Sequence, residues 1–237
     1  SIEASEQEVR ALLADGTVGL DVAGINGPRQ TVVSGDHTAI DVAAQHFEGL
    51  GRKVRRLAVS HAFHSEHMDA MLEAFGQVAQ GCTYHPAQIP IVSNVTGKQA
   101  GDQEITEADY WVKHVRSAVR FADGMHTLLD AGVTTFVEIG PRGVLSAMGM
   151  ACVPEDVEAV AEIRRDERER DDGEERELEQ DQLPVRVHED HRREGHRGRP
   201  EQVDQAPVVE LGPELEEEES VLEHLGGPVA IFSRQSH

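Results

Sequence analysis

The chain has 237 residues, of which 38% are apolar, and its formal net charge is −22 at pH 7. This charge argues against nucleic acids and anionic membranes as partners, because both are polyanions and would be repelled. No apolar run approaches the roughly 18 residues that span a bilayer, and the acidic N-terminal segment does not resemble a signal peptide. We therefore expect a cytoplasmic protein with no nucleic-acid or membrane partner.

The charge and the aromatic residues are distributed unevenly along the chain. Residues 1–154 contain 18 acidic and 11 basic residues and eight of the nine aromatic residues, whereas residues 155–237 contain 26 acidic and 11 basic residues, one aromatic residue and no lysine. Such a composition buries too little apolar surface to offset the entropy of the chain. We expect 154–237 to be an acidic low-complexity tail that is disordered or non-native, the latter through out-of-frame translation of a GC-rich gene.

The pattern of residues 1–59 predicts a β-α-β-β-α-β unit with a shortened first strand, the split ferredoxin-like arrangement. A capping box from Ser5 to Glu8 begins a helix that ends at Gly16, and alternating apolar residues over 18–22 predict a strand. A turn at 26–28 leads to a second strand over 31–34, as in a hairpin. A second helix and a strand over 53–59 follow, the helix burying Ala39, Val42, Ala43, Phe47 and Leu50.

Residues 60–153 have the pattern of an α/β (α+β) piece. Helices are predicted over 65–80, 119–129 and 144–150, with a further helix that opens after Thr106, and strands over 89–93 and 133–139. The glycine-containing turn at 140–143 lacks the lysine and the spacing of a phosphate loop, which favours a structural turn. Two strands are too few for an independent sheet, so this piece is expected to belong to a larger domain.

Three histidines, His61, His64 and His67, form the densest cluster of chemically competent side chains, at a predicted strand-to-helix junction. The three histidines are three residues apart, so on a helix each successive ring would be rotated further around the axis. This disfavours a metal site, whose ligands must converge. The same residues can act as caps or satisfied polar groups at an element boundary. A histidine held just before a helix can also serve as a general base, because its neutral form takes a proton from a hydroxyl near pH 7. The spacing alone leaves these alternatives open, and no metal is expected.

Seven short motifs occur along the first part of the chain, among them HAFH at 61–64. They lie at 25–28, 32–35, 51–53, 59–65, 92–97, 110–112 and 137–141. With these motifs, in this order, residues 1–153 resemble the C-terminal part of the acyltransferase domain of modular type I polyketide synthases. The resemblance implies a ferredoxin-like small subdomain at 1–59, followed at 60–153 by part of an α/β-hydrolase-like core.

The resemblance also implies a mechanism and assigns residues to it. The second histidine of the HAFH motif, His64, would be the catalytic base, His61 and Phe63 would set selectivity for malonyl units, and the backbone carbonyl near Arg120 would orient the base. The implied reaction is ping-pong transfer of a malonyl unit from malonyl-CoA to an acyl carrier protein, with no cofactor bound by this chain. Ketosynthase and other synthase domains would be further partners.

One part of the family's pattern is missing. The G-x-S-x-G elbow that carries the nucleophilic serine does not occur in this sequence, and in the family it lies N-terminal to the small subdomain. The isolated chain is therefore expected to be inactive. The alternative function is a non-catalytic interaction or docking module within a synthase.

Overall fold

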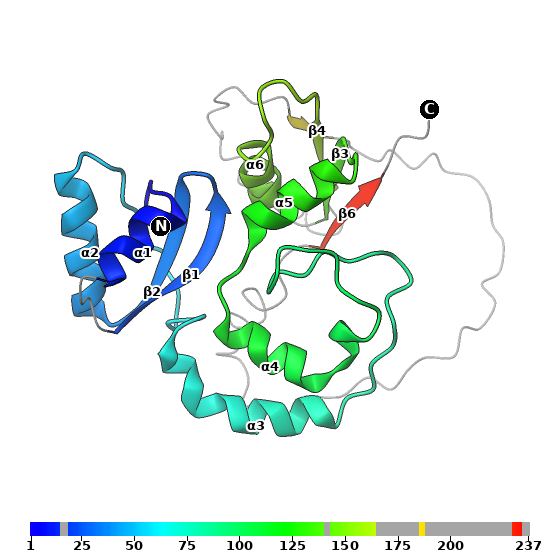
Figure 1. The fold of residues 1–237 in the computed structure, drawn as a ribbon, viewed down its shortest axis with the longest axis horizontal. Coiled ribbons are helices and arrows are strands. Elements are labelled where there is room, and N and C mark those ends of the chain that lie inside the picture. The colour runs from blue at the N-terminus through cyan, green and yellow to red at the C-terminus, as the bar shows by residue number, and fades with distance from the viewer. Residues whose placement is uncertain (15–18, 140–142, 165–184, 188–228, 234–237) are drawn as a thin grey trace, which may run out of the picture.

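The computed structural model describes the chain except for residues 15–18, 140–142, 165–184, 188–228 and 234–237, and it contains helices, a hairpin and a four-stranded sheet (Figure 1). The mixed helix and strand content is the expected α/β class. The helices are α1 (Glu6–Ala14), α2 (His37–Gly49), α3 (Asp69–Gln80), α4 (Ala108–Arg116), α5 (Phe121–Asp130) and α6 (Val144–Met150), with single 3-10 turns at Glu66–Met68 and Glu104–Thr106. The strands are β1 (Leu20–Gly27), β2 (Gln30–Gly35), β3 (Thr135–Ile139), β4 (Val160–Arg164), β5 (Val185–Val187) and β6 (Val229–Ser233).

The N-terminal unit has the pairing order of a split βαβ fold. β1 and β2 form an antiparallel hairpin, and Ile2 forms antiparallel bridges with Thr31 of β2 and with Val54. The order of the paired segments is therefore Val54, Ile2, β2, β1, as the ferredoxin-like arrangement requires. The predicted strand over 53–59 is reduced to a bridge at Val54, next to which the Arg55 amide donates to the Ser1 carbonyl at 2.8 Å.

The two helices of this unit follow the sequence pattern closely but not completely. The Glu8 carboxylate accepts from the Ser5 amide at 2.8 Å, which confirms the capping box at the start of α1. In α2 the buried residues are Ala39, Ala43 and Phe47, whereas Val42 is 55% exposed and Leu50 is 62% exposed. Val42 lies at the flank of the helical stripe and Leu50 lies beyond the last helical residue, so neither faces the core. The predicted helix end at Gly16 lies outside the described residues.

The segment between α3 and α4 differs most from its prediction. No strand forms at 89–93; Val92 makes a single bridge with Gln99, and Ile89 is 65% exposed. The segment 98–100 lies beside it, with the Ser93 amide donating to the Lys98 carbonyl and the Ala100 amide to the Ile91 carbonyl, both at 2.8 Å, but this pairing is too short to form a strand. The N-cap of α4 is Glu107 and not Thr106, whose hydroxyl instead donates to the Gln103 carbonyl at 2.8 Å.

The second sheet joins segments on both sides of Pro154. Its order is β5-β4-β3-β6, with β4 parallel to β3, β5 parallel to β4, and β6 antiparallel to β3. Helix α6 spans the predicted residues. Strands β4, β5 and β6 lie in the segment expected to be a tail and form one sheet with β3. The acidic stretches between them lie outside the described residues.

One hydrophobic cluster connects the N-terminal unit to the second sheet. It contains buried residues of both parts, and the backbone of β1 is linked to the segment before α5, where the Ile25 amide donates to the Val119 carbonyl at 2.8 Å. The buried members of the cluster are Ile2, Ala4, Val9, Val22, Ile25, Phe47, Ala122, Met125, Val133, Phe136, Cys152 and Ala159.

Among the described helices, none is long and apolar enough to cross a membrane.

Candidate active site

His64 lies in the short loop that connects the N-terminal unit to α3. Its φ is 60°, which makes it the one non-glycine residue with positive φ in the described part of the chain. The loop is fixed directly after it by Ser65, which is fully buried: the Ser65 hydroxyl donates to the Ala62 carbonyl at 2.6 Å and accepts from the His67 amide at 3.3 Å. The left-handed backbone is uncommon for a histidine, so the surrounding structure must hold it.

The imidazole of His64 is half-buried against the C-terminal end of α4. Its Nδ1 atom is buried and has no hydrogen-bond partner among the described residues. Burial lowers the pKa of His64, while the backbone groups of Ser117, His114 and Val115 act in the opposite direction more weakly. The carbonyl end of a helix favours a positive charge, which explains the sign of the backbone effect. The ring is therefore neutral near pH 7, the form that accepts a proton.

His61 and Phe63 lie on the same loop and contact each other. Their ring centroids are 5.8 Å apart with the planes inclined at 52°, and the exposed His61 approaches the Ser60 hydroxyl with its Nδ1 at 2.9 Å. The predicted pair of selectivity residues thus forms one aromatic surface beside His64.

His67 has a different partner. Its Nε2 lies 2.8 Å from a carboxylate oxygen of Asp36, at the start of α2. The three histidines therefore have three different environments, and among the described residues no group of three metal-ligating side chains converges.

Arg120 is placed differently from the expectation that its carbonyl orients the base. That carbonyl accepts from the Gly124 amide at 3.0 Å, in the first turn of α5, and the guanidinium bonds to Glu6 at 2.9 Å and to Asp123. The backbone groups that act on His64 belong instead to the last turn of α4 and to Ser117. The resemblance points to the segment 118–121, whereas these backbone groups lie just before it, at 114, 115 and 117, so the assignment of Arg120 stays a prediction.

Two residues next to His64, His114 and Arg116, were not identified from the sequence. The His114 ring packs edge-on against His64, with centroids 6.2 Å apart, and stacks on Tyr110 at 6.1 Å. Burial, and secondarily the nearby His64, lowers the pKa of His114. Arg116 approaches the carbonyl of His64. The i, i+4 spacing of Tyr110 and His114 was a usable signal that both lie on one face of a helix.

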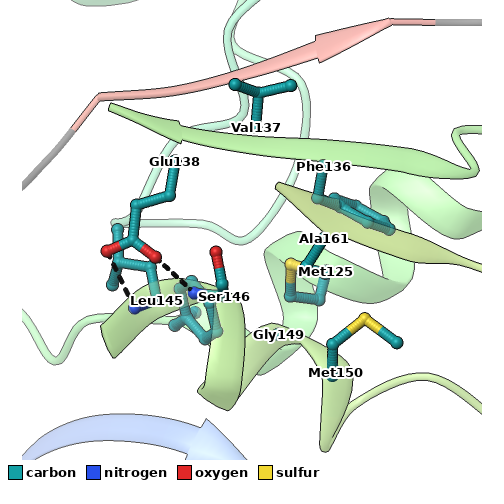
Figure 2. A pocket seen from close by; sticks show the side chains of 10 residues that line it. Met125, Phe136, Val137, Glu138, Leu145, Ser146, Gly149, Met150 and Ala161 are labelled. Atoms are coloured by element: carbon teal, nitrogen blue, oxygen red, sulfur yellow. Dashed lines mark hydrogen bonds between the residues drawn. The ribbon is translucent and has the colours of Figure 1, made fainter. Parts of the chain in front are cut away.

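A second feature lies between β3 and α6, where the structure has a small apolar hollow (Figure 2). The Glu138 carboxylate, only 2% exposed, points from β3 to the start of α6 and accepts from the amides of Leu145 at 3.1 Å and Ser146 at 2.6 Å. These bonds satisfy amides that a helix start leaves without partners. We therefore assign Glu138 a structural role; most of the predicted turn at 140–143 lies outside the described residues.

Comparisons with known proteins agree with this geometry. Residues 2–186 match the family model described as the acyl transferase domain. The chain is 49% identical over 157 residues to Polyketide synthase GfsA of Streptomyces halstedii, covering 65% of this chain and 2% of that protein. It is 44% identical over 163 residues to the spectinabilin polyketide synthase system protein NorB of Streptomyces orinoci, covering 69% and 8%.

A solved structure shows the same fold. The acyltransferase domain from the second module of the salinomycin polyketide synthase superposes with a TM-score of 0.62 at 48% identity, covering 68% of this chain and 38% of that one. The chain thus spans a small part of the synthases it matches and well under half of this solved domain. The chain belongs to the acyl transferase domain family of the polyketide synthases.

Proposed function

We propose that this chain supplies the general base and the selectivity loop of an acyltransferase that moves a malonyl unit from malonyl-CoA to the phosphopantetheine thiol of an acyl carrier protein. The observation that carries the proposal is the half-buried imidazole of His64, which lies at a left-handed position of the backbone and whose pKa is lowered by burial. Membership of the acyl transferase family supplies the reaction class.

In the proposed mechanism His64 handles the proton of each half-reaction. It takes the proton from a serine hydroxyl as the serine oxygen attacks the thioester carbonyl of malonyl-CoA, and the C–S bond breaks. The imidazolium returns that proton to the departing CoA sulfur. The phosphopantetheine thiol then gives its proton to His64 as its sulfur attacks the acyl-serine, and the serine oxygen recovers the proton. The reaction needs no resident cofactor, and the serine comes from a segment that this chain does not contain.

We further propose that Phe63 selects malonyl over methylmalonyl units. A phenyl ring beside the α-carbon of the extender unit leaves no room for an added methyl, and the contact between Phe63 and His61 would hold that ring in place. One methyl group in a pocket changes specificity by roughly 10- to 200-fold, so the selection is strong but not absolute. Ketosynthase and carrier domains of the same synthase are the proposed partners.

A chimeric domain tests the proposal. Residues 1–164 of this chain would replace the matching part of the salinomycin second-module acyltransferase domain, which is 48% identical in the aligned region. We expect the chimera to load malonyl onto a carrier protein, read out by mass spectrometry of the phosphopantetheine arm. The 237-residue chain alone is the control and should form no acyl adduct. A folded chimera that transfers no acyl group would favour the docking-module alternative.

A further inference from the structure

Arg116, the last residue of α4, connects three separate segments around the His64 loop. Its Nη2 lies 3.1 Å from a carboxylate oxygen of Asp21 in β1, and its Nε donates at 2.9 Å to Asp69, the first residue of α3. Its Nη1 donates at 3.5 Å to the backbone carbonyl of His64. One guanidinium therefore contacts the strand before the loop, the helix after the loop, and the loop itself.

The Asp21 oxygen that pairs with Arg116 also bonds the loop directly. It accepts from the amide of Glu66, two residues after His64, at 3.0 Å. Asp21 thus fixes the end of the loop while Arg116 contacts its middle, and Asp21 and Arg116 are paired with each other. The planar guanidinium with its five fixed donors can serve three acceptors in defined directions, whereas a lysine offers a single charged point.

The helix ends make this position favourable. Asp69 lies at the N-terminus of α3 and Arg116 at the C-terminus of α4, so each charge complements the dipole of its own helix as well as its partner. The two side chains are partly exposed, which makes the ion pair weak as a source of global stability. The effect of this ion pair is therefore expected on the local geometry of the loop, because the left-handed backbone of His64 is strained and must be held by its surroundings.

We propose that Arg116 is a positioning residue that holds His64 in its left-handed conformation by clamping the loop between Asp21 and Asp69. The inference rests on the proposed role of His64 only for its catalytic consequence; the geometric claim stands independently of catalysis. Arg116 itself touches no reacting atom.

The test is histidine labelling of the intact 237-residue chain with diethyl pyrocarbonate, which modifies neutral imidazoles. Rates are measured peptide by peptide, with His46 of α2 in the same sample as the internal standard. For Arg116→Gln we expect the labelling rate of His64 relative to His46 to rise about fivefold. The reason is that the loss of one hydrogen bond raises the population of the locally opened loop by about this factor. Arg116→Lys should give an intermediate rise, because one charged donor remains.

Arg120→Gln is the matched control. Arg120 also bonds two carboxylates, those of Glu6 and Asp123, and is about as exposed as Arg116, but in the described part of the chain its side chain makes no hydrogen bond or ion pair with the His64 loop. It should leave the ratio unchanged. An unchanged ratio in Arg116→Gln, or an equal rise in both variants, would overturn the proposal. If Arg116→Gln unfolds the chain, both histidines are labelled faster, and Arg116→Lys becomes the deciding variant. A His64-to-His46 labelling ratio in Arg116→Lys equal to that of the unaltered chain would then overturn the proposal.

The outcome is separable from that of the proposed function. Labelling reports the loop whether or not the chain ever takes part in acyl transfer. In the chimeric domain, Arg116→Lys should lower kcat about tenfold with KM for malonyl-CoA unchanged, because a misplaced base slows the chemical step and not binding. An inactive unaltered chimera with the expected labelling result would contradict the proposed function alone.

Discussion

The body of the molecule and the α3–α4 arm differ in how their apolar residues are covered. The body, residues 1–54 and 118–164, shares one continuous cluster that includes Ile2 and Phe47. The arm, residues 65–117, has few buried apolar side chains and exposes Val78 at 68% and Ile89 at 65%. In Figure 1 α3 and α4 lie beside each other. The candidate base His64 lies where the two regions meet, so its position depends on both.

The comparison explains why the proposed base, His64, depends on polar contacts for its position. A residue inside the body would be held by close packing, which fixes side chains to within small displacements. His64 lies at the edge of that packing, and the contacts that fix it are polar: Ser65 within the loop, and Arg116 with Asp21 across it. Small changes in these contacts should alter the site without unfolding the body.

The largest expected effect is on the reaction. In the chimeric domain, His64→Ala should lower the rate of acyl transfer by about 10² to 10⁴, the usual contribution of a general base. His67→Ala is the matched control, since His67 pairs with Asp36 and should lose much less. Steady-state transfer to the carrier protein measures both. A greater loss at His67 than at His64 would reverse the assignment.

Stability separates the body from the arm. Phe47→Ala removes a ring that is 2% exposed in the shared cluster and should lower the free energy of unfolding by about 3–5 kcal/mol. Val78→Ala on the exposed face of α3 should change it by less than about 0.5 kcal/mol. Urea denaturation followed by circular dichroism gives both values. Similar losses at the two positions would mean that the arm is covered as well as the body.

Substrate choice should change without loss of the base. The double variant His61→Tyr, Phe63→Ser opens space beside the extender unit and should shift the malonyl preference of the chimera toward methylmalonyl by about 10- to 200-fold. A competition assay with equal concentrations of the two CoA esters measures the product ratio. If the ratio does not move, selection depends on residues outside this loop.

The smallest expected effect is on pH dependence at the junction. Burial lowers the pKa of both His64 and His114 below the usual 6.5. A histidine with a lowered folded pKa contributes stability that is present above the unfolded pKa, and that contribution is lost as pH falls below about 6.5 toward the folded pKa. Imidazole NMR titration should show both rings titrating below 6.5 in the folded chain and near it in urea. Titration at or above 6.5 in the folded chain would mean that water reaches the rings.

Part of the fold could be predicted from local sequence alone. The capping box at Ser5, the hairpin of β1 and β2, and helix α6 all depend on interactions between residues close in the chain, and all three form, although β1 extends to Gly27, beyond the predicted 18–22. The HAFH motif likewise identified the loop that carries His64. The strand predicted at 89–93 did not form beyond a single bridge at Val92, because its pairing with 98–100 is too short and the tertiary structure leaves Ile89 exposed.

The sequence by itself determined where the chain turns, which helices form, and that an acyltransferase motif is present, because these follow from short-range propensity and from residue identity. Only the tertiary structure decided that β4, β5 and β6 form one sheet with β3, that the end of α4 lies beside His64, and that Arg116 connects Asp21 to Asp69. These contacts join residues 47 and 95 positions apart in the two Arg116 pairs, and no local pattern records which distant side chains the packing brings together.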